Sequence, residues 1–118
     1  MQNEERDLLG RTKRFARRVI RLYVSLPKAT VAQVLGKQAL RSGTSVGANY
    51  REANRARSKP EFVAKIGDCL KEADETAYWM ELLVEEEIVS KRRLEALVKE
   101  AYELVAIFVT ISKRARGD

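Results

Sequence analysis

Apolar residues recur at alternating steps of four and three along most of the chain, the spacing typical of amphipathic α-helices. In the first segment this row includes Leu8, Phe15 and Val19, and Pro27 ends the segment because the residue before a proline disfavours helical geometry. The pattern predicts four helices, over residues 4–25, 30–56, 59–86 and 91–114. Short connections between long helices force antiparallel neighbours. We therefore expect residues 1–118 to form a single all-α domain, an antiparallel up-down-up-down four-helix bundle.

The second predicted helix has the least regular pattern. Its row begins with Val31 and Leu35 and then turns polar at five positions, Gln38, Ser42, Ser45, Asn49 and Glu52. Polar groups that face a core need hydrogen-bond partners or water. Two alternatives follow. These residues form an internal hydrogen-bond network that fixes the helix register, or they form a surface that faces another subunit or a water-filled central channel. The three glycines in this helix suggest close approach of a neighbouring helix, because each lowers helix stability by about 1 kcal/mol.

The other two helices carry clearer signals. Ser58 and Glu61 form a capping-box pattern at the start of the third helix, with Pro60 in its first turn. The fourth helix is apolar almost all the way round over residues 104–111, and a helix of that kind is buried on more than one side. We therefore expect a subunit contact, with a candidate oligomer interface formed by Tyr78, Trp79, Leu104, Ile107, Phe108 and Ile111.

The residue types present argue against an enzyme. The chain has 118 residues with one cysteine and no histidine, so it lacks the commonest general base and metal ligand. Cys69 lies in an apolar row and is expected to be a buried thiol. We expect no catalytic residue, no metal and no cofactor. The longest apolar run, 104–109, is too short to cross a membrane, and the first residues lack a signal pattern, so a cytoplasmic location is expected.

Charge points to an acidic partner. The formal net charge is +6, and an up-down-up-down bundle would bring 12 of the 23 basic residues to one end. The candidate nucleic-acid-binding residues are Arg11, Lys13, Arg14, Arg17, Arg18, Arg51, Arg55, Arg57, Lys59, Lys113, Arg114 and Arg116. Such an end could hold phosphates through charge and bidentate arginine contacts. The alternative is a solvated end in which these side chains pair with nearby carboxylates.

Three short motifs carry a family resemblance. They are Ser45-Val-Gly-Ala-Asn49, Arg57-Ser-Lys59 and Glu75-Thr-Ala-Tyr-Trp79. With these motifs the chain resembles the bacterial four-helix bundle proteins named after the 23S rRNA intervening sequence. The resemblance implies a left-handed antiparallel bundle, a homo-oligomer that is a pentamer in related structures, and no enzymatic activity. The fold is also similar to that of the accessory variability proteins of diversity-generating retroelements, which bind nucleic acid and a reverse transcriptase.

Two functions remain open at this stage. The first is a non-enzymatic, oligomeric bundle that binds RNA or DNA backbones through its basic end. The second is a structural scaffold or adaptor for a protein partner, such as a reverse transcriptase. Neither hypothesis involves a membrane.

Overall fold

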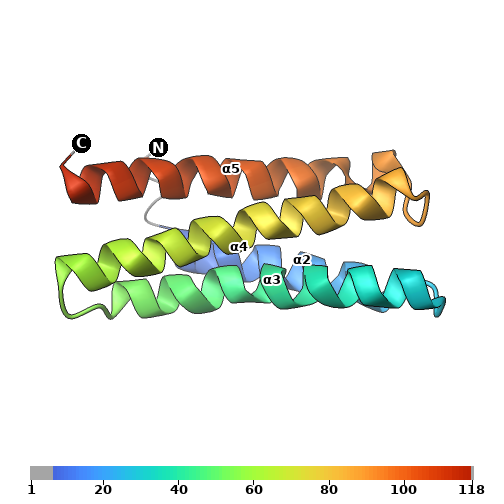
Figure 1. Ribbon diagram of the computed structural model, residues 1–118, viewed down its shortest axis with the longest axis horizontal. Helices are drawn as coiled ribbons and strands as arrows, with labels where there is room; N and C mark the ends of the chain where they lie inside the picture. Colours follow the sequence, from blue (N-terminus) through green and yellow to red (C-terminus); the bar gives the residue numbers. More distant parts are fainter. Residues whose placement is uncertain (1–6, 118) are drawn as a thin grey trace.

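The computed structural model describes residues 7–117 and consists of four helices. They are α2 (Leu8–Val24), α3 (Thr30–Asn54), α4 (Lys59–Glu85) and α5 (Lys91–Arg116). Consecutive helices run in opposite directions along an elongated body with extents of 45 × 23 × 22 Å (Figure 1). The predicted all-α fold and four-helix bundle are thus confirmed. The first helix was expected from residue 4, but residues 4–6 lie outside the described part of the chain.

The helices do not contact one another equally. Helix α3 packs along both α2 and α4, and α4 also packs along α5, whereas α2 and α5 touch only over a short stretch. The α3–α4 loop and the C-terminal end of α5 lie at one end of the bundle, and the other two loops lie at the opposite end (Figure 1). Among residues 7–117, no helix is long and apolar enough to span a bilayer.

Local signals fix where the helices begin. The Ser58 side chain accepts a hydrogen bond from the Glu61 amide at 3.1 Å, and Glu61 Oε2 accepts one from the Arg57 amide at 2.8 Å. The serine half of the expected capping box is therefore present, whereas Glu61 reaches back to the amide of Arg57, one residue before the N-cap Ser58. Ser90 similarly accepts from the Arg93 amide at 3.2 Å. Between α4 and α5 the chain turns through Glu87, whose φ of 60° is the one positive value at a non-glycine position in residues 7–117.

The buried face of α3 differs from the predicted row. Val31 is 58% exposed and Glu52 is also exposed, so the expectation that these two residues face the core was wrong. Instead, the buried row consists mainly of small residues: Ala32, Gly36, Ala39, Ser42, Gly43, Val46, Tyr50 and Ala53. A periodicity search favours large apolar residues, whereas α3 turns its small ones inward because its neighbours approach closely.

Glycines allow that close approach on the α2 side. A Cβ atom added to Gly43 would lie 2.9 Å from both terminal methyl carbons of Val19, and one added to Gly36 would overlap Leu26. Gly47 is also tight, since a Cβ there would be 3.1 Å from the Thr12 hydroxyl oxygen. The close packing expected from the glycines is therefore present, and α2 is the helix that it accommodates.

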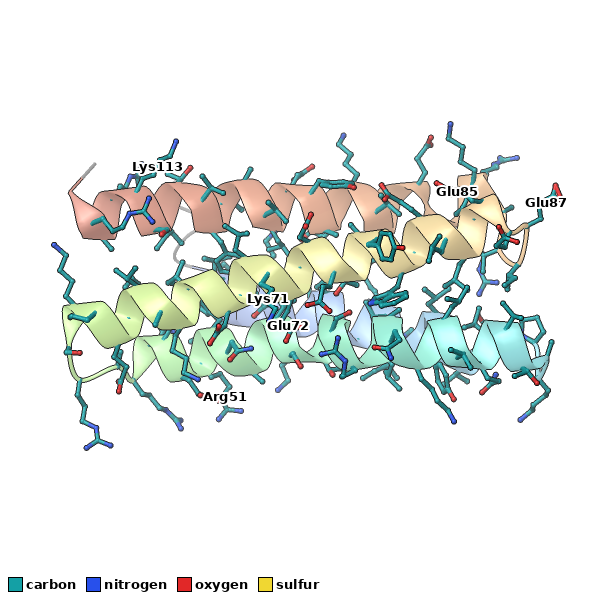
Figure 2. All side chains as sticks on the ribbon, in the orientation of Figure 1. Arg51, Lys71, Glu72, Glu85, Glu87 and Lys113 are labelled. Atoms are coloured by element: carbon teal, nitrogen blue, oxygen red, sulfur yellow. The ribbon has the colours of Figure 1, made fainter. Side chains whose placement is uncertain are left out.

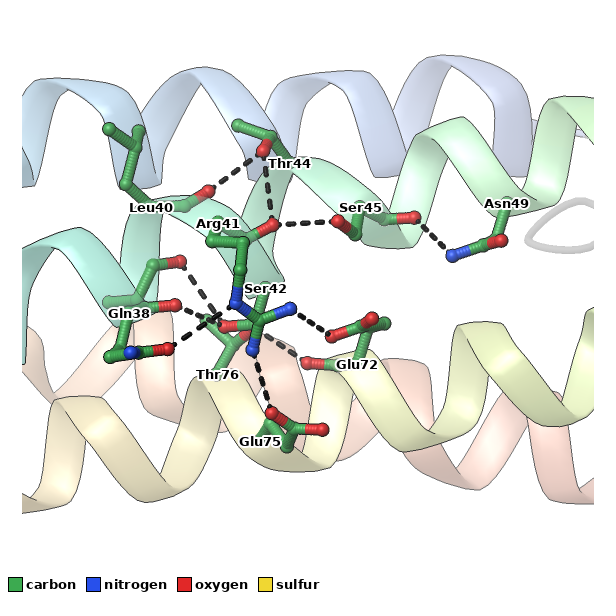
Figure 3. A network of polar contacts seen from close by, with 11 residues as sticks. Gln38, Leu40, Arg41, Ser42, Thr44, Ser45, Asn49, Glu72, Glu75 and Thr76 are labelled. Carbon is green, nitrogen blue, oxygen red and sulfur yellow. Dashed lines mark hydrogen bonds and ion pairs between the residues drawn. The ribbon is translucent and has the colours of Figure 1, made fainter.

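Of the five polar residues in the predicted α3 row, only Ser42 is fully buried. Ser42 of α3 and Thr76 of α4 are both buried, and their hydroxyl oxygens lie 2.8 Å apart where the two helices pack together (Figure 3). The Ser45 hydroxyl donates to the Arg41 carbonyl at 2.7 Å, and the Asn49 amide donates to the Ser45 carbonyl at 3.0 Å. Of the two alternatives, the internal network holds for Ser42, while the neighbouring polar side chains bond back to their own helix.

Candidate nucleic-acid interface

The outer face of α2 is strongly basic. Between Leu8 and Val24 there are six basic residues and no acidic ones. Lys13, Arg14, Arg17 and Arg21 are exposed, and Arg18 is half-buried. Helix periodicity explains this placement, because the apolar positions of α2 repeat every three or four residues and leave the basic ones on the opposite side.

Apolar residues hold that face in position. Leu8, Phe15 and Val19 have no exposed surface, and Leu22 is 5% exposed. Thr12 is buried in the same row, where its hydroxyl donates to the Leu8 carbonyl at 2.7 Å. The basic face therefore lies on a firmly packed helix.

Two of the predicted binding residues on α2 are engaged by carboxylates. Arg11 Nε lies 2.7 Å from Glu100 Oε2, and its Nη2 lies 2.8 Å from Glu103 Oε1, so this guanidinium ties α2 to α5. The hydrogen bond to Glu100 is the main reason that the pKa of Arg11 is raised. Arg14 pairs with Asp7 at 2.7 Å, on the surface. Arg11 is consequently a structural residue, which corrects its placement in the binding set.

A groove between α2 and α3, called here the α2–α3 groove, carries part of the basic face. Its volume is about 570 Å³. It is lined by Leu9, Thr12, Lys13, Ala16, Thr44, Gly47, Ala48, Arg51, Asn54 and Arg55. Lys13 on one side faces Arg51 and Arg55 on the other, and no acidic residue belongs to the lining. The sequence predicted that these three cations gather with others at one end of the bundle, and the structure places them around one groove.

A second, smaller groove of about 220 Å³ lies between α2 and α5. It is lined by Arg18, Arg21, Leu22, Arg93, Leu94 and Leu97. Arg18 was expected at the end that holds the α3–α4 loop. It lies instead beside the first turns of α5, near the opposite end, because α2 runs along the bundle and carries its later residues away from that loop.

Arg21 and Arg93 belong to this second cluster and were missed. Arg21 follows Arg17 and Arg18 by one helical turn, so periodicity alone could have identified it. Arg93 could not be found in that way, because it is 72 positions from Arg21 along the chain. The side chain of Arg93 contacts the Ser25 hydroxyl, which holds it next to the end of α2.

The remaining predicted cations cluster as expected. Arg51 and Lys113 lie toward the end that holds the α3–α4 loop, and Glu85 and Glu87 lie toward the other end (Figure 2). Other exposed cations of this group follow in the α3–α4 loop or at the ends of the flanking helices: Arg55, Arg57, Lys59, Arg114 and Arg116. The basic surface is thus a band along α2 that widens at this end, and the predicted basic end is only one part of it.

The predicted oligomer interface needs a larger correction. Leu104 and Phe108 have no exposed surface, and Ile107 is 5% exposed, so all three belong to the core of the chain itself. The Phe108 ring lies 6.1 Å from that of Tyr50, measured between centroids. The apolar arc of α5 is wide because α5 packs along α4, touches α2 and brings Phe108 close to Tyr50 of α3. Tyr78 is 54% exposed, whereas Trp79 and Ile111 are half-buried.

Cys69 lies in the core, as its apolar row predicts. It is completely buried, and burial raises the pKa of its thiol to about 12. A thiol of this kind stays protonated near neutral pH and is a poor nucleophile. Residues 7–117 also contain no group of three or more cysteine and carboxylate side chains that could hold a metal ion.

Comparisons with known proteins agree with the fold and the motifs. Residues 4–110 match the family model described as 23S rRNA-intervening sequence protein. A crystal structure from Bacteroides thetaiotaomicron, described as a protein with unknown function from the S23 ribosomal protein family, is 39% identical to this chain. The match covers 89% of this chain and 97% of that one, with a TM-score of 0.84. A search among curated proteins gives no significant match. The chain belongs to the 23S rRNA-intervening sequence protein family.

Proposed function

We propose that this protein is a non-enzymatic module that binds the phosphate backbone of RNA or DNA through the basic face of α2 and the adjoining part of α3. The observation that carries the proposal is the absence of any acidic residue from α2, next to five outward-facing cations. A solvated surface of ordinary composition mixes both signs of charge. A face with one sign attracts polyanions and steers them toward itself.

The arrangement suits backbone binding better than base reading. Arginine and lysine neutralise phosphates, and arginine can hold a phosphate with two parallel hydrogen bonds. The exposed aromatic residues among 7–117 are Tyr78 and Tyr102, which belong to α4 and α5. A stacking surface for bases is therefore missing from the basic face.

A salt titration tests this function. The wild-type protein would be titrated into a fluorescently labelled RNA hairpin and into a DNA duplex at salt concentrations from 50 to ~300 mM. We expect binding at low salt and a linear fall of log K with log salt concentration. Lack of binding at the lowest salt concentration, or an affinity independent of salt, would contradict the proposal.

A second candidate is a scaffold or adaptor for a protein partner, including further copies of the chain. Its support is an exposed apolar set on α3 and α4, with Val31 at 58%, Val34 at 55% and Tyr78 at 54% exposure. Exposed apolar groups of this kind mark interaction sites in many proteins. Mass measurement in solution tests self-association: a homo-oligomer, expected to be a pentamer, gives a multiple of the 13.4 kDa chain mass. A monomer at all concentrations would leave a different protein as the only partner for these side chains.

A further inference from the structure

We propose that the α2–α3 groove seats one sugar–phosphate backbone, with the phosphates held between Lys13 on α2 and the Arg51–Arg55 pair on α3. This inference rests on the proposed function and narrows it from a charged face to a defined site. The proposed site depends on the shape of the groove as well as on its charge, and separate variants can test each property.

The cations on the two rims are arranged to grip an anion from both sides. Arg51 and Arg55 are four residues apart, so they lie one above the other on the same side of α3. Lys13 faces them from α2. None of the three forms an ion pair within residues 7–117, and no carboxylate lines the groove. Their hydrogen-bond donors are therefore directed to solvent or to a ligand.

Small residues make the groove concave. Ala16, Gly47 and Ala48 form part of its lining, and none of them has a side chain larger than a methyl group. Gly47 is held against α2, since a Cβ atom there would lie 3.1 Å from the hydroxyl oxygen of Thr12. The resulting volume of about 570 Å³ is inside the range of roughly 300–1,000 Å³ that is common for ligand sites.

The lining also indicates which part of a nucleic acid would enter. It contains no aromatic side chain on which a base could stack. It combines cations with the apolar surface of Leu9, which is 48% exposed, and with the neutral amide of Asn54. Such a mixture is complementary to charged phosphates and the less polar faces of sugars. The backbone is therefore the part expected to enter, with the bases directed outward.

A groove-filling variant separates shape from charge. Ala48→Leu puts a branched side chain into the groove and keeps every cation, and Ala48 is exposed, so the helix accepts the change. With a labelled RNA hairpin at low salt, we expect affinity to fall by about tenfold, because the inserted side chain holds the backbone away from the rims. The matched control is Ala106→Leu, at an exposed alanine of α5 outside the groove, for which we expect an unchanged affinity.

Charge removal gives the second measurement. In Lys13→Gln/Arg51→Gln/Arg55→Gln, the slope of log K against log salt should fall by about 2–3, close to one for each lost phosphate contact. Polyglutamate of matched charge is expected to compete poorly with the hairpin, since a carboxylate side chain does not reproduce a continuous backbone.

The outcomes are distinct. If wild-type protein does not bind the hairpin, the proposed function fails and this site fails with it. If wild-type protein binds and Ala48→Leu binds equally well, only the groove is excluded and a diffuse basic surface is left. Equal competition by polyglutamate would also overturn the site, since any polyanion would then suffice.

Discussion

Helices α2 and α4 lie diagonally across the bundle and differ in how their charges are used (Figure 1). Helix α2 has six basic residues and no acidic ones, whereas α4 has seven acidic and three basic residues. Carboxylates of α4 bond to neighbouring helices: Arg41 of α3 contacts Glu75 at 2.8 Å and Glu72 at 3.4 Å, and Glu81 accepts a hydrogen bond from Tyr102 of α5 at 2.6 Å. Within residues 7–117, Arg11 is the one α2 cation that bonds to carboxylates of another helix, and four of the other five cations are exposed.

The molecule is therefore electrically divided from side to side. The acidic helix lies between two neighbours that it contacts along its length, so its charges contribute to holding the bundle together. The basic helix packs along one neighbour and leaves its outer face to solvent. Mutation of either helix can test that contrast.

The packing of α2 should depend on one large side chain. Phe15→Ala empties a completely buried position and should lower the free energy of unfolding by about 3–5 kcal/mol. Urea denaturation measures this value. The control is Ile20→Ala on the same helix, where 42% of the side chain is exposed, so the loss should be much smaller. Equal losses in both variants would mean that α2 is not anchored by its buried row.

The contrast in charge predicts unequal effects of equal charge removal. Arg17→Gln/Arg18→Gln/Arg21→Gln on α2 should weaken RNA binding by about 10–100-fold at low salt, because each lost phosphate contact removes counterion release. The matched variant replaces three lysines outside the basic band, two on α4 and one at the start of α5, and lowers the net charge by the same amount: Lys65→Gln/Lys71→Gln/Lys91→Gln. A fluorescence titration should give it a much smaller loss. Similar losses would show that net charge alone drives binding.

Two glycines should respond to alanine in opposite directions. Gly43→Ala should destabilise the protein by about 1–2 kcal/mol, since overpacking against Val19 exceeds the gain in helix propensity. Gly67 on α4 has no atom within 4 Å of an added Cβ, so Gly67→Ala should stabilise by about 1 kcal/mol. Thermal unfolding of both variants checks the signs. A stabilising Gly43→Ala would show that α2 can move away from α3 at little cost.

The buried hydroxyl pair should give the smallest effect. Thr76→Val removes the contact with Ser42 and should cost about 0.5–1.5 kcal/mol in unfolding free energy. In the double variant Ser42→Ala/Thr76→Val, the loss should be less than the sum of the single losses, because the two groups share one interaction. Thr44→Val serves as the control, because the Thr44 hydroxyl bonds within its own helix. Its loss of unfolding free energy should simply add to that of Thr76→Val.

Much of the fold could be predicted because its signals are local. Pro27 and the Ser58–Glu61 capping box act within a few residues, and the expected helix limits follow from them. The buried row of α3 could not be predicted from the sizes of its side chains. The position of this row depends on the short distance between α2 and α3. Glycine and alanine permit that short distance, but they give no distinct signal in a hydropathy pattern.

The basic surface was predicted only where sequence neighbours or loop ends define it. The cluster of Arg18 and Arg93 could be predicted only if it were known which turn of α2 lies beside which turn of α5. Arg11 was assigned to binding since nothing local reveals that Glu100 and Glu103 lie opposite. Leu104 and Phe108 were assigned to an interface because the width of an apolar arc does not tell whether the chain or a partner covers it.

The division between α2 and α4 has a consequence for how molecules of this protein behave in concentrated solution. A net charge of +6 would make uniformly charged particles repel one another. Here the basic side of one molecule can face the acidic side of the next, so repulsion depends on orientation. At low ionic strength, the osmotic second virial coefficient should fall below the value for a uniform sphere of equal charge. Added salt should narrow the gap between these two values, since it screens the orientation-dependent attraction.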